Sequence, residues 1–237
     1  LTIELPVTVE HSLRKNAVAV CRLEEKKVEI FSSSKAIVRN RYVITVLNPH
    51  GDGYGNYSNH YDKLRKLNNI NGTLYDALGK KIKSMQKKDL LDMAYNDEIS
   101  LMTDDRMKRF SFNHTSYPYT VEFTDEEQLN GTFFLPSWNP VPGQKFSVQH
   151  SSFEVVLHEG ADVRFKELNV PEKPIEKVAG KQKSYVWTLK DFPAYEREWF
   201  QPAPENFLPN VYLAPVEFTI GNYTGKMDTW ENLGKFI

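Results

Sequence analysis

The sequence predicts an all-β fold: a large antiparallel β-sandwich (super-sandwich) with few or no helices. Segments rich in β-branched and aromatic residues recur along the chain, and several of them alternate apolar with polar residues. They lie at 28–31, 42–47, 119–123, 153–157, 163–165 and 185–189. Turn signals separate the segments at short intervals, as an antiparallel sandwich requires. Alternation buries one face of a strand and leaves the other in water, which predicts sheets packed face to face.

Three turns carry specific signals. Residues 76–79 read Asp-Ala-Leu-Gly, which predicts a type I turn closing a hairpin with a bulge. Asn130-Gly131 suits a type I′ turn before a strand at 132–135. Residues 141–144 read Val-Pro-Gly-Gln, which suits a type II turn because Pro fixes one φ angle and Gly supplies a positive one.

Helical signals are few. Residues 61–67 are long enough for two helical turns, and residues 87–93 fit either a helix or a strand, but neither has caps at both ends. The proline-rich stretch 193–215 reads as extended surface chain, because aromatic residues are interleaved with its prolines. We expect one domain over 1–237, with residues 142–144 as the candidate boundary between two sheet systems.

Composition excludes several classes of protein. The 237 residues include 30 Lys and Arg against 31 Asp and Glu, a net charge of −1. A protein that binds nucleic acid or a membrane surface through bulk charge would be expected to carry a basic excess. No apolar run approaches the ~20 residues of a membrane-spanning helix. We therefore expect no nucleic-acid partner and no transmembrane segment.

The sequence predicts no catalytic residue, no metal and no cofactor. Cys21 is the single cysteine and lies in the apolar run 17–23, which predicts a buried, inert thiol. No His-x-x-x-His pair exists, and the acidic clusters at 104–105 and 125–127 read as solvated turns. The Gly-rich stretch 50–57 reads as a surface loop. An enzyme built on a pair of carboxylates stays an alternative, because so many acidic residues leave such a pair open.

Two aromatic loops are candidates for a surface that binds a glycan or a peptide, because exposed aromatic clusters often mark binding faces. The alternative is that the rings cover one end of the sandwich as part of its core. The candidate residues are Tyr54, Tyr57, Tyr61, Tyr195, Trp199 and Phe200.

Five Asn-x-Ser/Thr sequences occur in the chain. About two would be expected by chance, and a secreted glycoprotein of this size often has disulfides, which a single cysteine cannot form within the chain. We interpret the five as Asn-rich turns and do not predict that they are glycosylated. They begin at Asn56, Asn71, Asn113, Asn130 and Asn222.

An ordered set of segments resembles a known family. In this order and spacing they are similar to the β-rich N-terminal domain of unknown function that precedes a transglutaminase-like, papain-related domain in exported bacterial proteins. The similarity runs through nearly the whole chain, although no single motif is diagnostic. The segments are 41–48 (RYVITVLN), 72–80 (GTLYDALGK), 104–106 (DDR), 117–123 (YPYTVEF) and 230–236 (WENLGKF).

This resemblance implies a non-catalytic accessory or scaffold role. In such proteins the Cys-His-Asp chemistry belongs to the downstream domain, assigned as a protease or protein cross-linker, and no residue here matches its motifs. That downstream domain in the same polypeptide is the implied partner, the implied location is the periplasm or cell envelope, and the chain is expected to be an excised N-terminal domain. The alternative is an independent glycan- or peptide-binding module. The residues implied at the interdomain junction are Trp230, Leu233, Gly234 and Phe236.

Overall fold

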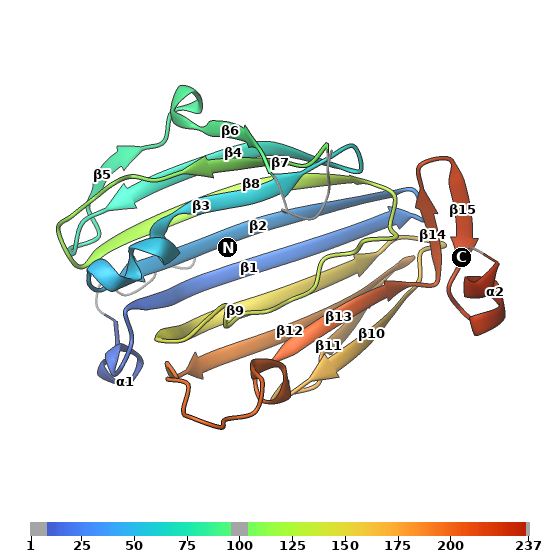
Figure 1. Cartoon of the computed structure of the whole chain (residues 1–237). Helices are drawn as coiled ribbons and strands as arrows, with labels where there is room; N and C mark the ends of the chain where they lie inside the picture. The colour runs from blue at the N-terminus through green and yellow to red at the C-terminus, as the bar shows by residue number, and fades with distance from the viewer. Residues whose placement is uncertain (1–8, 96–103, 236–237) are drawn as a thin grey trace.

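The computed structural model describes residues 9–95 and 104–235, and it confirms the all-β class (Figure 1). Its largest element is one eight-stranded sheet with the order β11-β12-β9-β1-β2-β8-β4-β5. The strands of this sheet are β1 (Ala19–Ser32), β2 (Lys35–Val46), β4 (Arg65–Tyr75), β5 (Lys81–Ser84), β8 (Tyr119–Asn130), β9 (Phe146–Leu157), β11 (Ile175–Ala179) and β12 (Gln182–Phe192).

Three smaller sheets accompany the large one (Figure 1). The order β3-β7-β6 forms one of them, from β3 (Tyr57–Tyr61), β6 (Leu91–Ala94) and β7 (Arg106–Phe110). The other two are the pairs β10 (Val163–Leu168) with β13 (Asn210–Pro215), and β14 (Glu217–Ile220) with β15 (Tyr223–Lys226). The short helical elements are α1 (His11–Arg14), η1 (Pro49–Gly55), η2 (Lys87–Asp89), η3 (Pro204–Asn206) and α2 (Trp230–Gly234).

The large sheet is mixed, so the prediction of purely antiparallel pairing needs one correction. Strands β1 and β9 run parallel, with Ala19 opposite Phe146 and Ile30 opposite Leu157. A parallel pair needs a long connection, and here the chain between the two strands forms β2 to β8 before β9 returns beside β1. Residues 142–144 lie in the loop between β8 and β9, which are strands of this same sheet.

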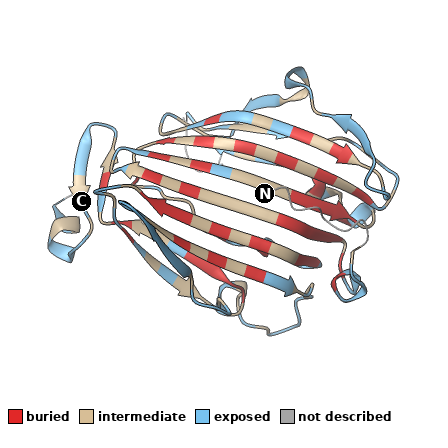
Figure 2. Ribbon diagram, turned by 180° about the vertical axis from the view of Figure 1, so that it is seen from behind, coloured by how far each residue is buried: buried red, intermediate tan, exposed pale blue. Residues whose placement is uncertain are grey.

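The core lies between the large sheet and the smaller sheets. Strand β8 shows the cause most clearly, because its side chains alternate between buried and partly buried along all twelve residues. Figure 2 shows the same striping on neighbouring strands, seen from behind. Aromatic rings fill the centre: Phe153 stacks on Trp138 at 6.2 Å and on Trp187 at 5.6 Å between ring centroids.

The hairpin predicted at 76–79 is confirmed. Strands β4 and β5 pair on either side of it, with a register shift between Leu74 and Tyr75. The Asp76 carboxylate accepts hydrogen bonds from the amides of Leu78 and Lys80, each at 2.9 Å. Gly79 takes a φ of +78°, which glycine adopts without steric cost.

Two of the other predicted turns are wrong. Gly131 has a φ of +120° but Asn130 does not take the positive φ of a type I′ turn, and residues 132–135 form no strand. The reason is a close backbone crossing, because a Cβ on Gly131 would lie 2.1 Å from the Thr219 carbonyl oxygen. At 141–144 the positive φ falls on Lys145 instead of Gly143, so the turn is not type II.

The helical expectations also change. Residues 61–67 are not helical: β3 ends at Tyr61, a turn follows, and β4 begins at Arg65. In that turn the Asp62 carboxylate accepts hydrogen bonds from the amides of Leu64 (2.7 Å) and Arg65 (2.8 Å), which favours the turn over a helix. Residues 87–93 divide into the 3-10 turn η2 and the beginning of β6.

Candidate functional site

The six predicted aromatic residues do not form one surface. Tyr57 belongs to the core: it has no exposed area, and its hydroxyl donates a hydrogen bond to Asp125 Oδ2 at 2.9 Å. Tyr61 lies in the three-stranded sheet, where its hydroxyl bonds to Asp92 Oδ2 at 2.7 Å and accepts from Arg106 Nε at 2.9 Å. Both side chains therefore serve the packing of the fold.

Tyr54 and Tyr195 are brought together at one end of the large sheet. The Tyr54 hydroxyl donates to the Gln144 carbonyl at 3.0 Å, and its ring packs 4.6 Å from Phe146. Burial, followed by the charge of Tyr195, raises the pKa of Tyr54, in keeping with the proximity of the two rings. Both are half-buried, so they contribute to the edge of the core more than to a free surface.

Trp199 and Phe200 are the two predicted residues that the structure leaves in solvent. Trp199 is 94% exposed and Phe200 is fully exposed. The loop that carries them is anchored at its base, where the amide of Arg197 donates to the Gln144 side chain at 2.9 Å and Lys145 N donates to the Tyr195 carbonyl at 2.9 Å. Because these hydrogen bonds hold the base of the loop, its two exposed rings can contact a partner.

The predicted junction residues lie near the end of the described chain. Trp230 begins α2, a helix of five residues, and is 88% exposed. The Thr229 side chain caps this helix by accepting from the amide of Asn232. Leu233 is half-buried, Gly234 is exposed, and Phe236 lies outside the described residues.

The acidic cluster at 125–127 is not a solvated turn, and that expectation is wrong. Asp125 and Glu127 sit inside β8 and point toward the core, each only 5% exposed. The Asn40 amide donates to Asp125 Oδ1 at 2.7 Å and to Glu127 Oε1 at 2.9 Å. Burial raises the pKa of Asp125 above its ordinary value, although the hydrogen bond from Asn40 opposes the shift.

Lys26 and Glu24 of β1 form a second group of polar side chains next to Asp125 and Glu127. Lys26 Nζ donates to the Ser137 carbonyl at 2.8 Å, and burial lowers the pKa of this lysine. Ser151 donates to Glu24 and accepts from the Trp138 indole at 2.8 Å. Burial raises the pKa of Glu24. These side chains bond mainly to one another or to the backbone, so we assign them to the architecture of the core.

The open face of the large sheet carries a polar hollow of about 530 Å³. Its arginines are paired across strands: Arg41 bonds to Glu122 at 2.9 Å and to Glu25 at 3.1 Å, and Arg39 bonds to Glu126 at 2.9 Å and to Glu29. Because each arginine already has two carboxylate partners, this face is a solvated ion-pair ladder.

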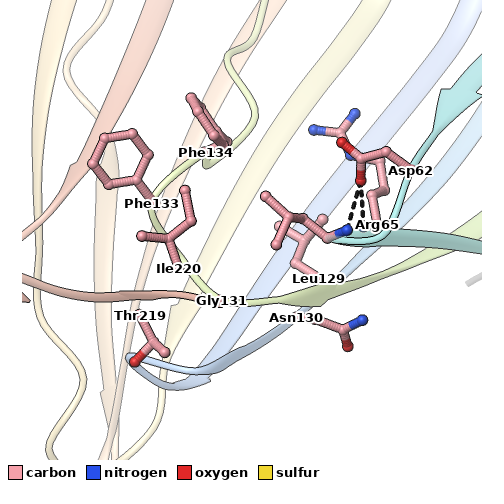
Figure 3. A pocket seen from close by; sticks show the side chains of 10 residues that line it. Asp62, Arg65, Leu129, Asn130, Gly131, Phe133, Phe134, Thr219 and Ile220 are labelled. Atoms are coloured by element: carbon pink, nitrogen blue, oxygen red, sulfur yellow. Dashed lines mark hydrogen bonds between the residues drawn. The ribbon is translucent and has the colours of Figure 1, made fainter. Parts of the chain in front are cut away.

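A smaller pocket of about 250 Å³ combines an apolar wall with two side chains of opposite charge, Asp62 and Arg65 (Figure 3). It lies where the end of β8, the beginning of β4, the segment 131–134 and β14 meet. The sequence analysis missed this site. The sequence feature that pointed to it is the Phe133-Phe134 pair, which the sequence analysis placed in a strand at 132–135. The lining residues are Asp62, Leu64, Arg65, Leu129, Asn130, Gly131, Phe133, Phe134, Thr219 and Ile220.

At the charged end of the pocket, Asp62 and Arg65 have hydrogen-bonding atoms that no described residue engages. Asp62 uses one carboxylate oxygen, Oδ1, for the two backbone amides of its own turn. Arg65 Nε lies 3.4 Å from Glu127 Oε2, which has no hydrogen-bond partner in the described chain. Within the same residues, no hydrogen bond engages Asp62 Oδ2 or the terminal nitrogens of Arg65.

Two observations concern the thiol and possible metal ligands. Cys21 is 3% exposed, and burial raises the pKa of its thiol well above the ordinary value. Among residues 9–95 and 104–235, no cluster of three His, Cys, Asp or Glu is arranged to hold a metal ion. None of the helices in those ranges is long and apolar enough to cross a membrane.

Comparisons with known proteins identify the family of this chain and a solved structure with a similar fold. Residues 32–196 match the family described as a domain of unknown function with solved structure, DUF3857. No curated protein matches the sequence. A protein from Parabacteroides distasonis, described as a "putative protease", has a similar fold, with a TM-score of 0.71 at 16% identity. The similarity covers 83% of this chain and 40% of that protein, so the chain spans less than half of its length.

An M1 zinc metallopeptidase from Deinococcus radiodurans is more distant. Its TM-score is 0.39 at 8% identity, over 88% of this chain and 46% of that one. A TM-score below 0.5 does not indicate a shared fold.

Proposed function

Because the chain belongs to the DUF3857 family of domains of unknown function, we propose that it is a non-catalytic accessory domain of a longer protein. In that protein it positions either the substrate or the catalytic domain. A transglutaminase-like domain with protease or cross-linking activity, following in the same polypeptide, is the proposed partner. An exported bacterial protein of the periplasm or cell envelope is the proposed setting.

The observation that carries this proposal is the state of the only thiol. Papain-related chemistry needs an exposed cysteine whose thiolate is stabilised by a neighbouring cation or a helix N-terminus. Cys21 lies near the beginning of β1, buried, and burial raises the pKa of its thiol. The Parabacteroides protein supports the same view, since this fold makes up only 40% of its chain.

Two measurements test the accessory role. The native polypeptide is expected to be heavier than the 27.5 kDa of this sequence, and the purified chain is expected to hydrolyse neither peptides nor esters. A native mass near that value would contradict the proposal. So would turnover by the purified chain that disappears in Cys21→Ala.

A second candidate function is an independent glycan- or peptide-binding module, favoured by the exposure of Trp199 and Phe200. On a glycan and peptide array, binding is expected to be lost in Trp199→Ala and retained in Tyr61→Phe, which changes a hydroxyl in the three-stranded sheet. If the wild-type chain binds no glycan or peptide on the array, this function is refuted.

A further inference from the structure

We propose that the pocket lined by Phe133, Phe134 and Arg65 binds one apolar side chain of an extended peptide, together with the backbone amide next to it. The site gives the accessory role a substrate class and rests on that role for its biological use. Binding itself can be measured without it.

The apolar wall fits a side chain of leucine or phenylalanine size. Phe133 is fixed by Phe218, 4.8 Å away, and meets Phe134 edge-to-face at 4.7 Å. Phe134 remains 59% exposed, so the pocket offers a ring that the fold itself does not cover. The cavity of about 250 Å³ corresponds to roughly eight water molecules. Displacing such water from apolar walls favours binding of an apolar group.

The geometry of the two rings disfavours a sugar. Their planes stand at 85° to each other, so they offer no flat platform on which a pyranose ring can stack across both. Leu129 and Ile220 complete the wall with aliphatic carbon, which suits a side chain inserted end-on (Figure 3). The peptide is therefore the occupant that this wall favours.

The charged end selects a neutral group with both a donor and an acceptor. Arg65 offers free N–H donors and Asp62 Oδ2 offers a free acceptor, and these are what a peptide C=O and N–H require. A ligand carboxylate would lie near Asp62 and Glu127, and a ligand ammonium would lie near Arg65. Lys63 close by is already paired with Asp104. A neutral amide is repelled neither by these carboxylates nor by the guanidinium of Arg65.

The pocket is built on rigid backbone, which reduces the entropy lost on binding. Gly131 forms a bridge with Ile220, and Thr219 N donates to the Ser33 carbonyl at 2.8 Å. The amide of Thr132 donates to the same carbonyl at 3.1 Å. Both walls of the pocket are thus tied to the β1–β2 turn and keep their separation without a ligand.

The test is a titration of the whole chain with Ac-Ala-Phe-Ala-NH₂, followed by ¹H–¹⁵N NMR. Chemical shifts of Gly131, Phe134 and Ile220 are expected to move, with a dissociation constant in the millimolar range. Phe134→Ala is expected to weaken binding by about fivefold or more, as the loss of one buried aromatic contact predicts. Leu78→Ala, which shortens a 77% exposed apolar side chain in the β4–β5 turn, is the matched control and is expected to change nothing.

Two further arms examine the polar end. Asp62→Asn keeps the oxygen that caps the turn and replaces the free acceptor by a donor, so it is expected to weaken binding by about threefold. Ac-Ala-Glu-Ala-NH₂ and Ac-Ala-Lys-Ala-NH₂ are expected to bind more weakly than the phenylalanine peptide. No shift at about 20 mM peptide, or equal binding in Phe134→Ala, would overturn the proposal and leave the accessory role standing. The accessory role fails separately, on native mass or turnover.

Discussion

Replacing Tyr57 by Phe removes one oxygen atom from the core. The Tyr57 hydroxyl donates to Asp125 Oδ2 at 2.9 Å, and the tyrosine has no exposed surface. Its ring packs 5.7 Å from Phe123, a contact that phenylalanine preserves. The substitution therefore isolates a single hydrogen bond to a buried carboxylate.

The expected loss follows from the charge of the acceptor. A hydrogen bond to a charged group contributes about 1.5–3 kcal/mol, and its removal leaves part of a buried carboxylate unsatisfied. Asp125 would keep the Asn40 bond at 2.7 Å and a weaker one from Asn59 at 3.4 Å. We expect Tyr57→Phe to lower the free energy of unfolding by about 2 kcal/mol at pH 7.

The loss should depend on pH in a definite direction. Burial already raises the pKa of Asp125 in the folded protein, and the Tyr57 bond opposes that shift. A carboxyl whose folded pKa is raised favours folding below its unfolded pKa, and this contribution is lost as pH rises through the folded pKa. The variant has the higher folded pKa, so the difference between the two proteins is largest at neutral pH and shrinks toward pH 4.

Urea unfolding followed by tryptophan fluorescence measures both quantities. Tyr75→Phe is the matched control, because the Tyr75 hydroxyl donates to Glu122 Oε2 at the same 2.9 Å but on the open face of the sheet. We expect its loss to be below about 1 kcal/mol. Equal losses for the two variants, or a Tyr57→Phe loss that does not diminish in acid, would refute the reasoning.

Three other predictions concern the core and the turns. Cys21 is expected to resist iodoacetamide in the native protein and to react once urea unfolds it, and rapid native labelling seen by mass spectrometry would contradict its burial. Gly131→Ala is expected to cost about 2–4 kcal/mol in urea unfolding, because strain at positive φ adds to the contact with Thr219. Gly160→Ala, also at positive φ but with no atom within 4 Å of the added Cβ, should cost only about 1 kcal/mol. Asp76→Ala removes two acceptor contacts of the β4–β5 turn and should lower Tm by about 2–4 °C, read by circular dichroism; an unchanged Tm would contradict the role of this turn.

Local chemistry explains what the sequence could predict of the fold. Alternation along 119–123 and 185–189 marks the inward faces of β8 and β12, because strand periodicity is a property of consecutive residues. The turn at 76–79 was also predictable, since its Asp and Gly act on backbone groups two to four residues away.

Features that depend on distant strands were not predictable in this way. Asp125 and Glu127 read as a polar turn until Asn40 of β2 and Tyr57 of β3 are seen to supply their hydrogen bonds. Tyr57 itself looked like a loop aromatic, because nothing near it in sequence shows that β8 buries it. The parallel pairing of β1 with β9 likewise joins segments that are more than 100 residues apart.

The same distinction between local and distant contacts applies to the candidate site. Trp199 was a candidate for an exposed binding surface, with burial in the core as the alternative, and the structure leaves it 94% exposed. The pocket was missed, since its lining combines Phe134, Arg65 and Ile220 from three separate parts of the chain. The pairing of β4 with β8 sets Arg65 opposite Leu129, and the crossing of Gly131 over Thr219 brings β14 to the same place.

The parallel pairing of β1 and β9 also affects the order in which the protein folds. During synthesis, β1 can pair with β2 as soon as both emerge, but its other edge waits for residues 146–157. Until then the nascent chain presents an unpaired strand edge, which is a template for aggregation. Closing so long a loop is also slow. Refolding of this domain should therefore fall in yield as protein concentration rises, and a chaperone that shields the β1 edge should restore it.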